Sequence, residues 1–155
     1  MTFSYYSCII CYEILNSLFI NDKNISFKNI RIKRIIDKVK FKKYVDEFNN
    51  YKLDIAGTIK TDEYNELVEK EDRTEEEETR FNELQAELTE IYQTLLQEKL
   101  NENVELDIDL FTFEEFNSLV PDNMFNSVHI EITDLTLEND SYIETFYELL
   151  IKKDC

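Results

Sequence analysis

The stretch that decides the fold of this sequence is residues 74–100, TEEEETRFNELQAELTEIYQTLLQEKL. Its apolar side chains recur at a spacing of three and four residues, which places them on one face of an α-helix: Phe81, Leu84, Leu88, Ile91 and Leu95. Thr74 followed by Glu77 is typical of a capping box and predicts that the helix begins there. At 1.5 Å per residue such a helix is roughly 40 Å long. It therefore needs a partner helix, in this chain or in another.

A second long helix is predicted over residues 28–56. Its apolar positions are helically spaced: Ile32, Ile35, Ile36, Val39, Phe41, Val45, Phe48, Tyr51 and Ile55. Gly57 follows, and glycine most easily adopts the left-handed conformation that ends many helices. Between the two helices, residues 62–70 fit either a short helix or a flexible tip. We therefore expect residues 28–100 to form a long antiparallel helical hairpin.

The rest of the sequence changes character on either side of this hairpin. Residues 4–19 predict a buried N-terminal helix. Residues 104–110 and 127–133 alternate apolar and polar side chains, which predicts two half-buried strands that pair with each other. A short helix after Thr112 lies between them, and Ser141 with Glu144 opens a C-terminal helix to Lys152.

The predicted fold class is therefore α+β and mainly α. It comprises the antiparallel helical hairpin, the N-terminal helix, a small antiparallel β-hairpin and the C-terminal helix. We expect a single domain over residues 1–155, in which an α/β cap of residues 101–155 packs with the N-terminal helix.

Composition excludes several classes of function. The chain of 155 residues contains one glycine, whereas phosphate-binding loops and dinucleotide-binding turns need several. A net charge of −17 argues against direct contact with nucleic acid or with an anionic membrane. Residues 5–20 are apolar but too short and too polar to span a bilayer, and no targeting signal is visible, so we expect synthesis in the cytoplasm.

The charge is segregated along the chain. Residues 23–43 hold nine of the seventeen basic residues and one acid, whereas residues 62–115 hold twenty acids and four basic residues. Opposite charges in two arms predict that the arms pair within the chain, or that copies of the chain meet head to tail.

Four sets of residues are candidates for chemistry. Cys8-x-x-Cys11 has the spacing of a redox pair or of half a zinc site, but Cys155 and His129 are not spaced as further ligands. The better interpretation is two small side chains in a helical core. His129, the single histidine, is expected on the polar face of a strand rather than in a catalytic dyad, and an enzyme would need a pocket joining His129 or Cys11 to carboxylates.

The other two candidates are charged. Glu105, Asp107 and Asp109 present three carboxylates that a divalent cation could use, although a solvated face or pairing with the basic arm explains them more simply. The basic residues 33–43 could contact phosphates, but they are interleaved with apolar side chains and predict the outer face of a packed helix. We therefore expect no catalytic, cofactor or metal site.

Two pieces of the sequence have a familiar order. The first is EILNSLF followed by ISFKNIRIKRIIDKV and YVDEFNNYKLDI, and the second is FNELQAELTEIYQTLLQEKLNENVELDIDLFTFEEF. In this order, over most of residues 13–116, the chain resembles a family of small uncharacterised proteins encoded among the late genes of tailed bacteriophages. The resemblance rests on hydrophobic spacing and on the E-L-D-I strand. It implies a phage origin and a structural or accessory role, with no active site to carry over.

The sequence thus favours a non-enzymatic bacteriophage protein that acts through protein–protein contacts, as a virion structural or assembly component located in the virion. Its partners are other phage structural proteins or copies of itself. The candidate contact surfaces are the hairpin stripe and an edge strand: Leu84, Leu88, Ile91, Leu95, Val128, Ile130 and Ile132. For the stripe, the simpler alternative is that it forms the hairpin's own core. The alternative is a small acidic inhibitor that mimics DNA and binds a host DNA-processing or defence enzyme.

Overall fold

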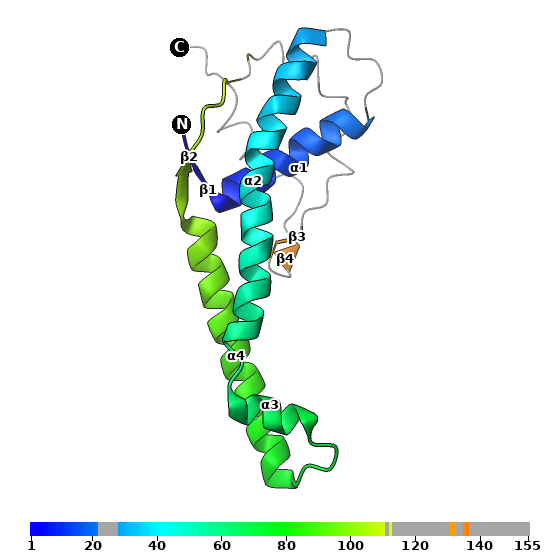
Figure 1. Cartoon of the computed structure of the whole chain (residues 1–155), viewed down its shortest axis with the longest axis vertical. Helices are drawn as coiled ribbons and strands as arrows, with labels where there is room; N and C mark the ends of the chain where they lie inside the picture. The colour runs from blue at the N-terminus through cyan, green and yellow to red at the C-terminus, as the bar shows by residue number, and fades with distance from the viewer. Residues whose placement is uncertain (22–27, 111, 113–130, 133–134, 137–155) are drawn as a thin grey trace. The chain divides into compact units, whose positions relative to one another are not determined.

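The computed structural model describes residues 1–21, 28–110, 112, 131–132 and 135–136 (Figure 1). They belong to two compact units, Met1–Asp46 with Asn101–Cys155 (unit 1) and Glu47–Leu100 (unit 2). This part of the chain is mainly helical, with four helices and small antiparallel strand pairs. The prediction of a mainly α protein with a small antiparallel β component is confirmed.

Unit 1 begins with a short strand, β1 (Thr2–Ser4), followed directly by α1 (Tyr5–Asn21). The helix starts after Ser4 because the Ser4 hydroxyl accepts a hydrogen bond from the backbone N–H of Ser7 at 3.0 Å, as an N-cap residue does. The predicted helix over residues 4–19 is confirmed to within two residues at each end. Among the described residues of unit 1, the side chains of α1 supply most of the buried apolar positions: Tyr5, Cys8, Ile9, Ile10, Cys11, Ile14 and Leu15.

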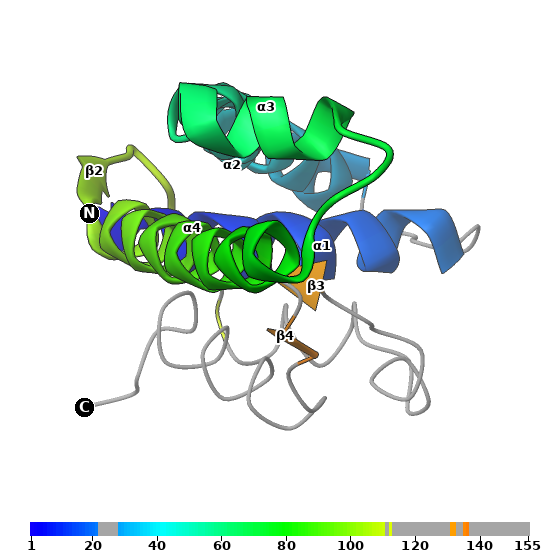
Figure 2. The same ribbon diagram turned by 90° about the horizontal axis from the view of Figure 1, so that it is seen from below.

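β1 pairs antiparallel with β2 (Asn103–Glu105), with Phe3 opposite Val104 (Figure 1). The backbone N–H of Tyr5 extends the ladder by donating to the Glu102 carbonyl at 3.1 Å. In the far part of the sequence, β3 (Glu131–Ile132) pairs with β4 (Leu135–Thr136), both drawn in orange in Figure 2. β2 and β3, which lie in or overlap the two predicted strands, thus have partners other than those expected.

The prediction that residues 104–110 form a strand paired with residues 127–133 is therefore wrong for the residues that the structure describes. The strand is shorter, and its partner is the start of the chain. Alternation of apolar and acidic residues indicates a half-buried extended segment but does not choose its partner strand. Beyond Glu105, the carbonyls of Asp107 and Asp109 accept hydrogen bonds from the side chains of Lys40 and Arg34, which belong to the helix α2 (Lys28–Thr58).

α2 (Lys28–Thr58) is one continuous helix that confirms the prediction for residues 28–56. Gly57 does not end it, which corrects the expected left-handed cap. The φ angle of Gly57 lies outside the left-handed region, and the N–H of Ile59 still donates to the Ile55 carbonyl at 3.1 Å. The helix therefore passes through this glycine, at a cost in helix propensity of about 1 kcal/mol relative to alanine.

The section of α2 in unit 1 packs through aromatic rings. Phe41 is fully buried, and its ring meets that of Phe3 edge to face, with centroids 5.2 Å apart. Tyr44 meets Tyr5 in the same way at 5.6 Å. Edge-to-face pairs add about 0.5–1.5 kcal/mol each beyond the burial of their area. These contacts join α2 to β1 and the start of α1.

Unit 2 contains the second section of α2 with α3 (Asp62–Glu69) and α4 (Glu75–Asn101). The expected helix over residues 74–100 is confirmed, and the ambiguous residues 62–70 form a helix rather than a flexible tip. The Lys99 ammonium lies 5.4 Å from the centroid of the Tyr51 ring, which brings the end of α4 beside this section of α2. The buried apolar residues of unit 2 are Phe48, Ile55, Phe81, Leu84, Leu96 and Leu100.

Several expectations stay predictions. The antiparallel hairpin as a whole would combine residues 28–46 of unit 1 with residues 75–100 of unit 2, and the C-terminal helix over 141–152 lies outside the described residues. The single-domain arrangement of cap and N-terminal helix likewise remains a prediction. Among the described residues, no helix combines the length and the apolar character that crossing a membrane requires.

Candidate interaction surfaces

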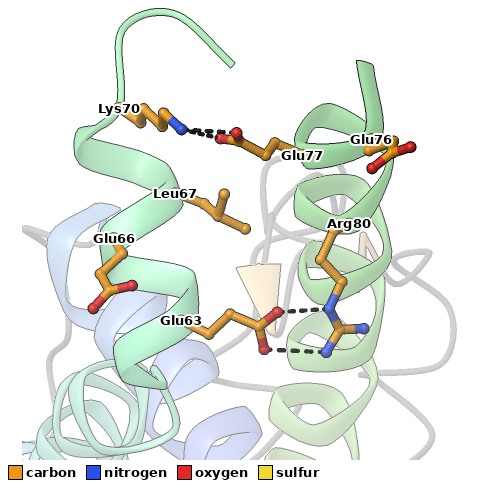
Figure 3. Close-up of a pocket in the computed structure, with 7 residues that line it drawn as sticks. All are labelled: Glu63, Glu66, Leu67, Lys70, Glu76, Glu77 and Arg80. Atoms are coloured by element: carbon orange, nitrogen blue, oxygen red, sulfur yellow. Dashed lines mark hydrogen bonds and ion pairs between the residues drawn. The ribbon is translucent and has the colours of Figure 1, made fainter. Parts of the chain in front are cut away.

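A groove lies between α3 and the first turns of α4, with a volume of about 350 Å³. A threonine caps the start of each helix: the backbone N–H of Tyr64 donates to the Thr61 hydroxyl, and the backbone N–H of Glu77 donates to the Thr74 hydroxyl, each at 3.2 Å. Figures 1 and 2 both show α3 beside the start of α4, joined to it by one short loop. In Figure 3, Leu67 points into the space between the helices, whereas Glu66 and Glu76 point away from it.

Two ion pairs cross this groove (Figure 3). The Arg80 guanidinium donates two hydrogen bonds to the Glu63 carboxylate, at 2.8 and 3.2 Å. The Lys70 ammonium lies 2.6 Å and 2.7 Å from the two carboxylate oxygens of Glu77. Bonding to these cations lowers the pKa of both carboxyl groups below the ordinary range, and the same bond raises the pKa of Arg80.

The groove's charges therefore complement one another rather than a missing ligand. Any anion or cation that entered would have to replace a pair that already exists, in solvent-exposed positions where such pairs contribute little. The Arg73 guanidinium also stacks over the Phe81 ring, 4.0 Å from its centroid. The charged side chains that cross the groove therefore connect α3 to α4.

The predicted contact stripe on α4 is divided between interior and surface. Leu84 is buried, Leu88 and Leu95 are half-buried, and Ile91 is 47% exposed. The buried face is completed instead by Leu96 and Leu100, because a 3.6-residue repeat drifts away from a strict 3-4-3-4 spacing over several turns. Ile91 thus stands at the border between the packed face of α4 and its glutamate-rich face.

The structure also reveals a surface that the sequence analysis missed. On α2, Ile35, Ile36 and Val39 are 42%, 52% and 62% exposed and share one face of the helix. The signal was present in the sequence. Ile35, Ile36 and Val39 lie on one side of the predicted helix, whereas Phe41, Tyr44 and Phe48 lie on the other, so α2 has more apolar residues than one face can bury.

The opposite face of this section buries two charged side chains. Arg34 donates from Nη1 to Asp37 Oδ2 at 2.8 Å and to the Asp109 carbonyl at 2.7 Å. Both side chains are almost completely buried. One turn after Asp37, the Lys40 ammonium donates to the Asp107 carbonyl at 2.5 Å. The basic arm therefore contacts the acidic segment within unit 1, with Arg34 and Lys40 bound to backbone carbonyls.

Cys8 and Cys11 lie one turn apart inside α1, and both are completely buried. Burial raises the pKa of the Cys8 thiol to about 12, and burial together with the neighbouring Cys8 raises that of Cys11 well above its ordinary value. The thiolate that redox or metal chemistry requires is disfavoured there. Their assignment as core residues is confirmed.

The acidic triplet does not converge on one point. The Glu105 carboxylate accepts a hydrogen bond from the Thr2 hydroxyl and lies 3.6 Å from the amino group of Met1. Among the described residues, no group of three or more histidine, cysteine or acidic side chains has the geometry to hold a metal ion. The edge-strand candidates Val128 and Ile130, and His129 between them, fall outside the described residues, and Ile132 forms part of β3.

Comparison with known proteins adds no relative: the chain matches no protein-family model, curated protein or solved structure. The resemblance to phage late-gene proteins therefore stays a prediction from the sequence.

Proposed function

We propose that this protein is a non-enzymatic bacteriophage protein that acts through protein–protein contacts, as a virion structural or assembly component. The observation that supports this best is the exposed apolar face of α2, formed by Ile35, Ile36 and Val39. Exposed aliphatic side chains grouped on one helix face and bordered by polar side chains mark a surface that binds another protein. Ile91 on α4 supplies a second exposed apolar position.

The proposed architecture supports this role. It joins α2 and α4 in a long antiparallel hairpin and adds the C-terminal helix of residues 141–152. A hairpin of this length displays side chains over a distance larger than the width of a small domain. A phage origin, and hence a location in the virion after synthesis in the host cytoplasm, rests on the resemblance to late-gene proteins.

The test is mass spectrometry of purified phage particles, together with capture from infected cells by the tagged full-length chain. Stoichiometric presence in particles supports the structural role. The variant Ile36→Asp should lose the captured phage protein, because a charge in the apolar face leaves an ion to be desolvated on binding. Leu53→Asp, a matched change at an α2 position that is 74% exposed, should retain it.

The second candidate function is inhibition of a host DNA-processing or defence enzyme by mimicry of DNA. Unit 2 favours it, because residues 47–100 hold sixteen acidic and six basic residues, a net charge of −10. On α4, Glu83, Glu87 and Glu90 are exposed. A regular array of carboxylates on a rigid helix can occupy a basic surface that normally binds phosphates.

The two candidates are separated by which variant abolishes capture. The inhibitor hypothesis predicts absence from particles, a host enzyme as partner, and loss of that partner when Glu83, Glu87 and Glu90 are changed together to glutamine. It also predicts that Ile36→Asp has no effect on that partner. Capture of a phage protein that survives the glutamine changes and is lost with Ile36→Asp supports the structural role instead.

A further inference from the structure

The exposed face of α2 is apolar in its centre and basic at one end. Ile35, Ile36 and Val39 form its centre. Lys42 and Lys43 lie one turn further along the same side of the helix, and both are exposed. Lys42 pairs with Asp46 at 2.6 Å, and that hydrogen bond raises the pKa of Lys42, so its ammonium stays charged.

The border of the packed face on α4 has the opposite character. Ile91, with Leu88 and Leu95 one turn away on either side, forms a narrow apolar row. Glu87 and Glu98 are exposed at the two ends of this row, and Arg80 lies 3.8 Å from the Glu87 carboxylate. The row is too narrow to form an interface alone and needs a partner surface that is apolar with basic flanks.

The first section of α2 and the helix α4 carry net charges of opposite sign. Residues 28–46 contain eight basic and two acidic residues, a net charge of +6. Residues 75–100 contain eight acidic and two basic residues, a net charge of −6. Two copies that met through the same face would place like charges together, whether the face was that of α2 or that of α4, whereas α2 of one copy against α4 of another places opposite charges together.

We propose that copies of this chain associate head to tail, with the α2 face of one copy (Ile35, Ile36 and Val39) packed against the Ile91 row on α4 of the next. This inference rests on the proposed function, because it names the partner of the contact surface described there. The contact is heterologous: each copy uses one face and leaves the other free, so that copies add in sequence to form a ring or a filament. The apolar area is small, which makes the association weak and concentration-dependent.

The test is sedimentation velocity of the full-length chain over a concentration series, at an ionic strength of ~0.15 M, where the Debye length of about 8 Å screens the net charge of the copies but not contacting pairs. The wild type should sediment faster as its concentration rises. Ile36→Asp and Ile91→Lys should each remain monomeric, because each lacks one of the two faces. A mixture of the two variants should form a dimer that does not grow, because one intact interface remains.

Leu53→Asp is the matched control and should associate like the wild type: Leu53 is on the same side of α2 as Ile35 but five turns, about 27 Å, further along the helix, outside both contact faces. Circular dichroism establishes that the variants keep their helices, and Val39→Asp serves as a second variant of the α2 face. Self-association that survives Ile91→Lys or Ile36→Asp would indicate contact between identical faces and overturn the head-to-tail arrangement. A wild type that stays monomeric throughout would overturn it as well.

Failure of this inference is distinguishable from failure of the proposed function. A monomeric wild type that still captures a phage protein, and loses it with Ile36→Asp, removes the self-contact and keeps the contact role. A wild type that self-associates but captures nothing and is absent from particles does the reverse.

Discussion

The first section of α2 and the helix α4 distribute their side chains in opposite ways. On α4, glutamates face solvent while Phe81, Leu84 and Leu96 are buried, as in an ordinary amphipathic helix. On α2, the buried face contains the charged pair of Arg34 and Asp37, while three aliphatic side chains face outward. The stability of α4 thus comes from simple apolar burial. The first section of α2 departs from this pattern, because its buried face combines Phe41 with a charged pair and leaves three aliphatic side chains exposed.

The largest expected effect lies at the buried pair of α2. Asp37→Leu leaves the Arg34 guanidinium buried beside an apolar side chain, and we expect the free energy of unfolding to fall by about 3–5 kcal/mol. The double change Arg34→Met with Asp37→Leu removes both charges and should recover most of that loss, because an apolar pair needs no compensation. Equilibrium denaturation in urea measures both variants. A single variant as stable as the wild type would show that the pair is not buried in solution.

On α4 the corresponding change is Leu96→Ala, at a fully buried position. We expect a loss of about 2–5 kcal/mol, from lost apolar burial and from the cavity left behind. Leu53→Ala makes the same chemical change at an exposed position and should cost within about 0.5 kcal/mol. Equal losses at both positions would contradict the assigned faces. Because both residues lie in unit 2, thermal unfolding of the whole chain can compare them directly.

A smaller effect is expected at the start of α4. Thr74→Ala removes the hydroxyl that accepts from the Glu77 N–H and should cost about 1 kcal/mol. Thr89→Ala is the control: its hydroxyl only bonds back to the Gln85 carbonyl in the helix interior, and alanine favours helix there. Urea denaturation should rank Thr74→Ala below the wild type and Thr89→Ala at or above it. The reverse order would place the start of the helix elsewhere.

The two helices also differ in how much of them the sequence could predict. The apolar spacing and Thr74 predicted α4 almost residue by residue, because local periodicity and local capping determine it. α2 was predicted as a helix, but not which of its faces is buried. Phe41 and Tyr44 on one side, and Ile35 and Val39 on the other, are both helically spaced. Which side is buried depends on contacts with the rings of Phe3 and Tyr5, which are distant from α2 in the sequence.

The same limit explains the strand pairing and the candidate surfaces. Val104 sits in a strand as its alternation predicts, but its partner Phe3 belongs to a three-residue strand too short to recognise from a pattern. Glu63 and Arg80 are seventeen residues apart on different helices, so their contact depended on the angle between α3 and α4. The apolar spacing predicts that Ile91 belongs to the stripe on α4, whereas its exposure follows from the drift of the helical repeat.

The smallest expected effect lies in the charge network between α3 and α4, and it separates surface charge from the buried charge of α2. Arg80→Gln removes the two hydrogen bonds to Glu63, both solvent-exposed. We therefore expect only a small loss of stability at neutral pH, far below that of the Asp37→Leu variant. The contribution of the pair is present at neutral pH and should disappear in acid. The folded-state pKa of Glu63 is lowered below its ordinary 4.5, so its contribution is present above that value and is lost as the pH falls through the folded pKa. Stability measured as a function of pH by circular dichroism should thus show a slightly lower value for Arg80→Gln above about pH 4.5, and the two curves should converge below it. A large loss of stability at neutral pH would mean that the ion pairs between α3 and α4, rather than the buried leucines of α4, stabilise unit 2.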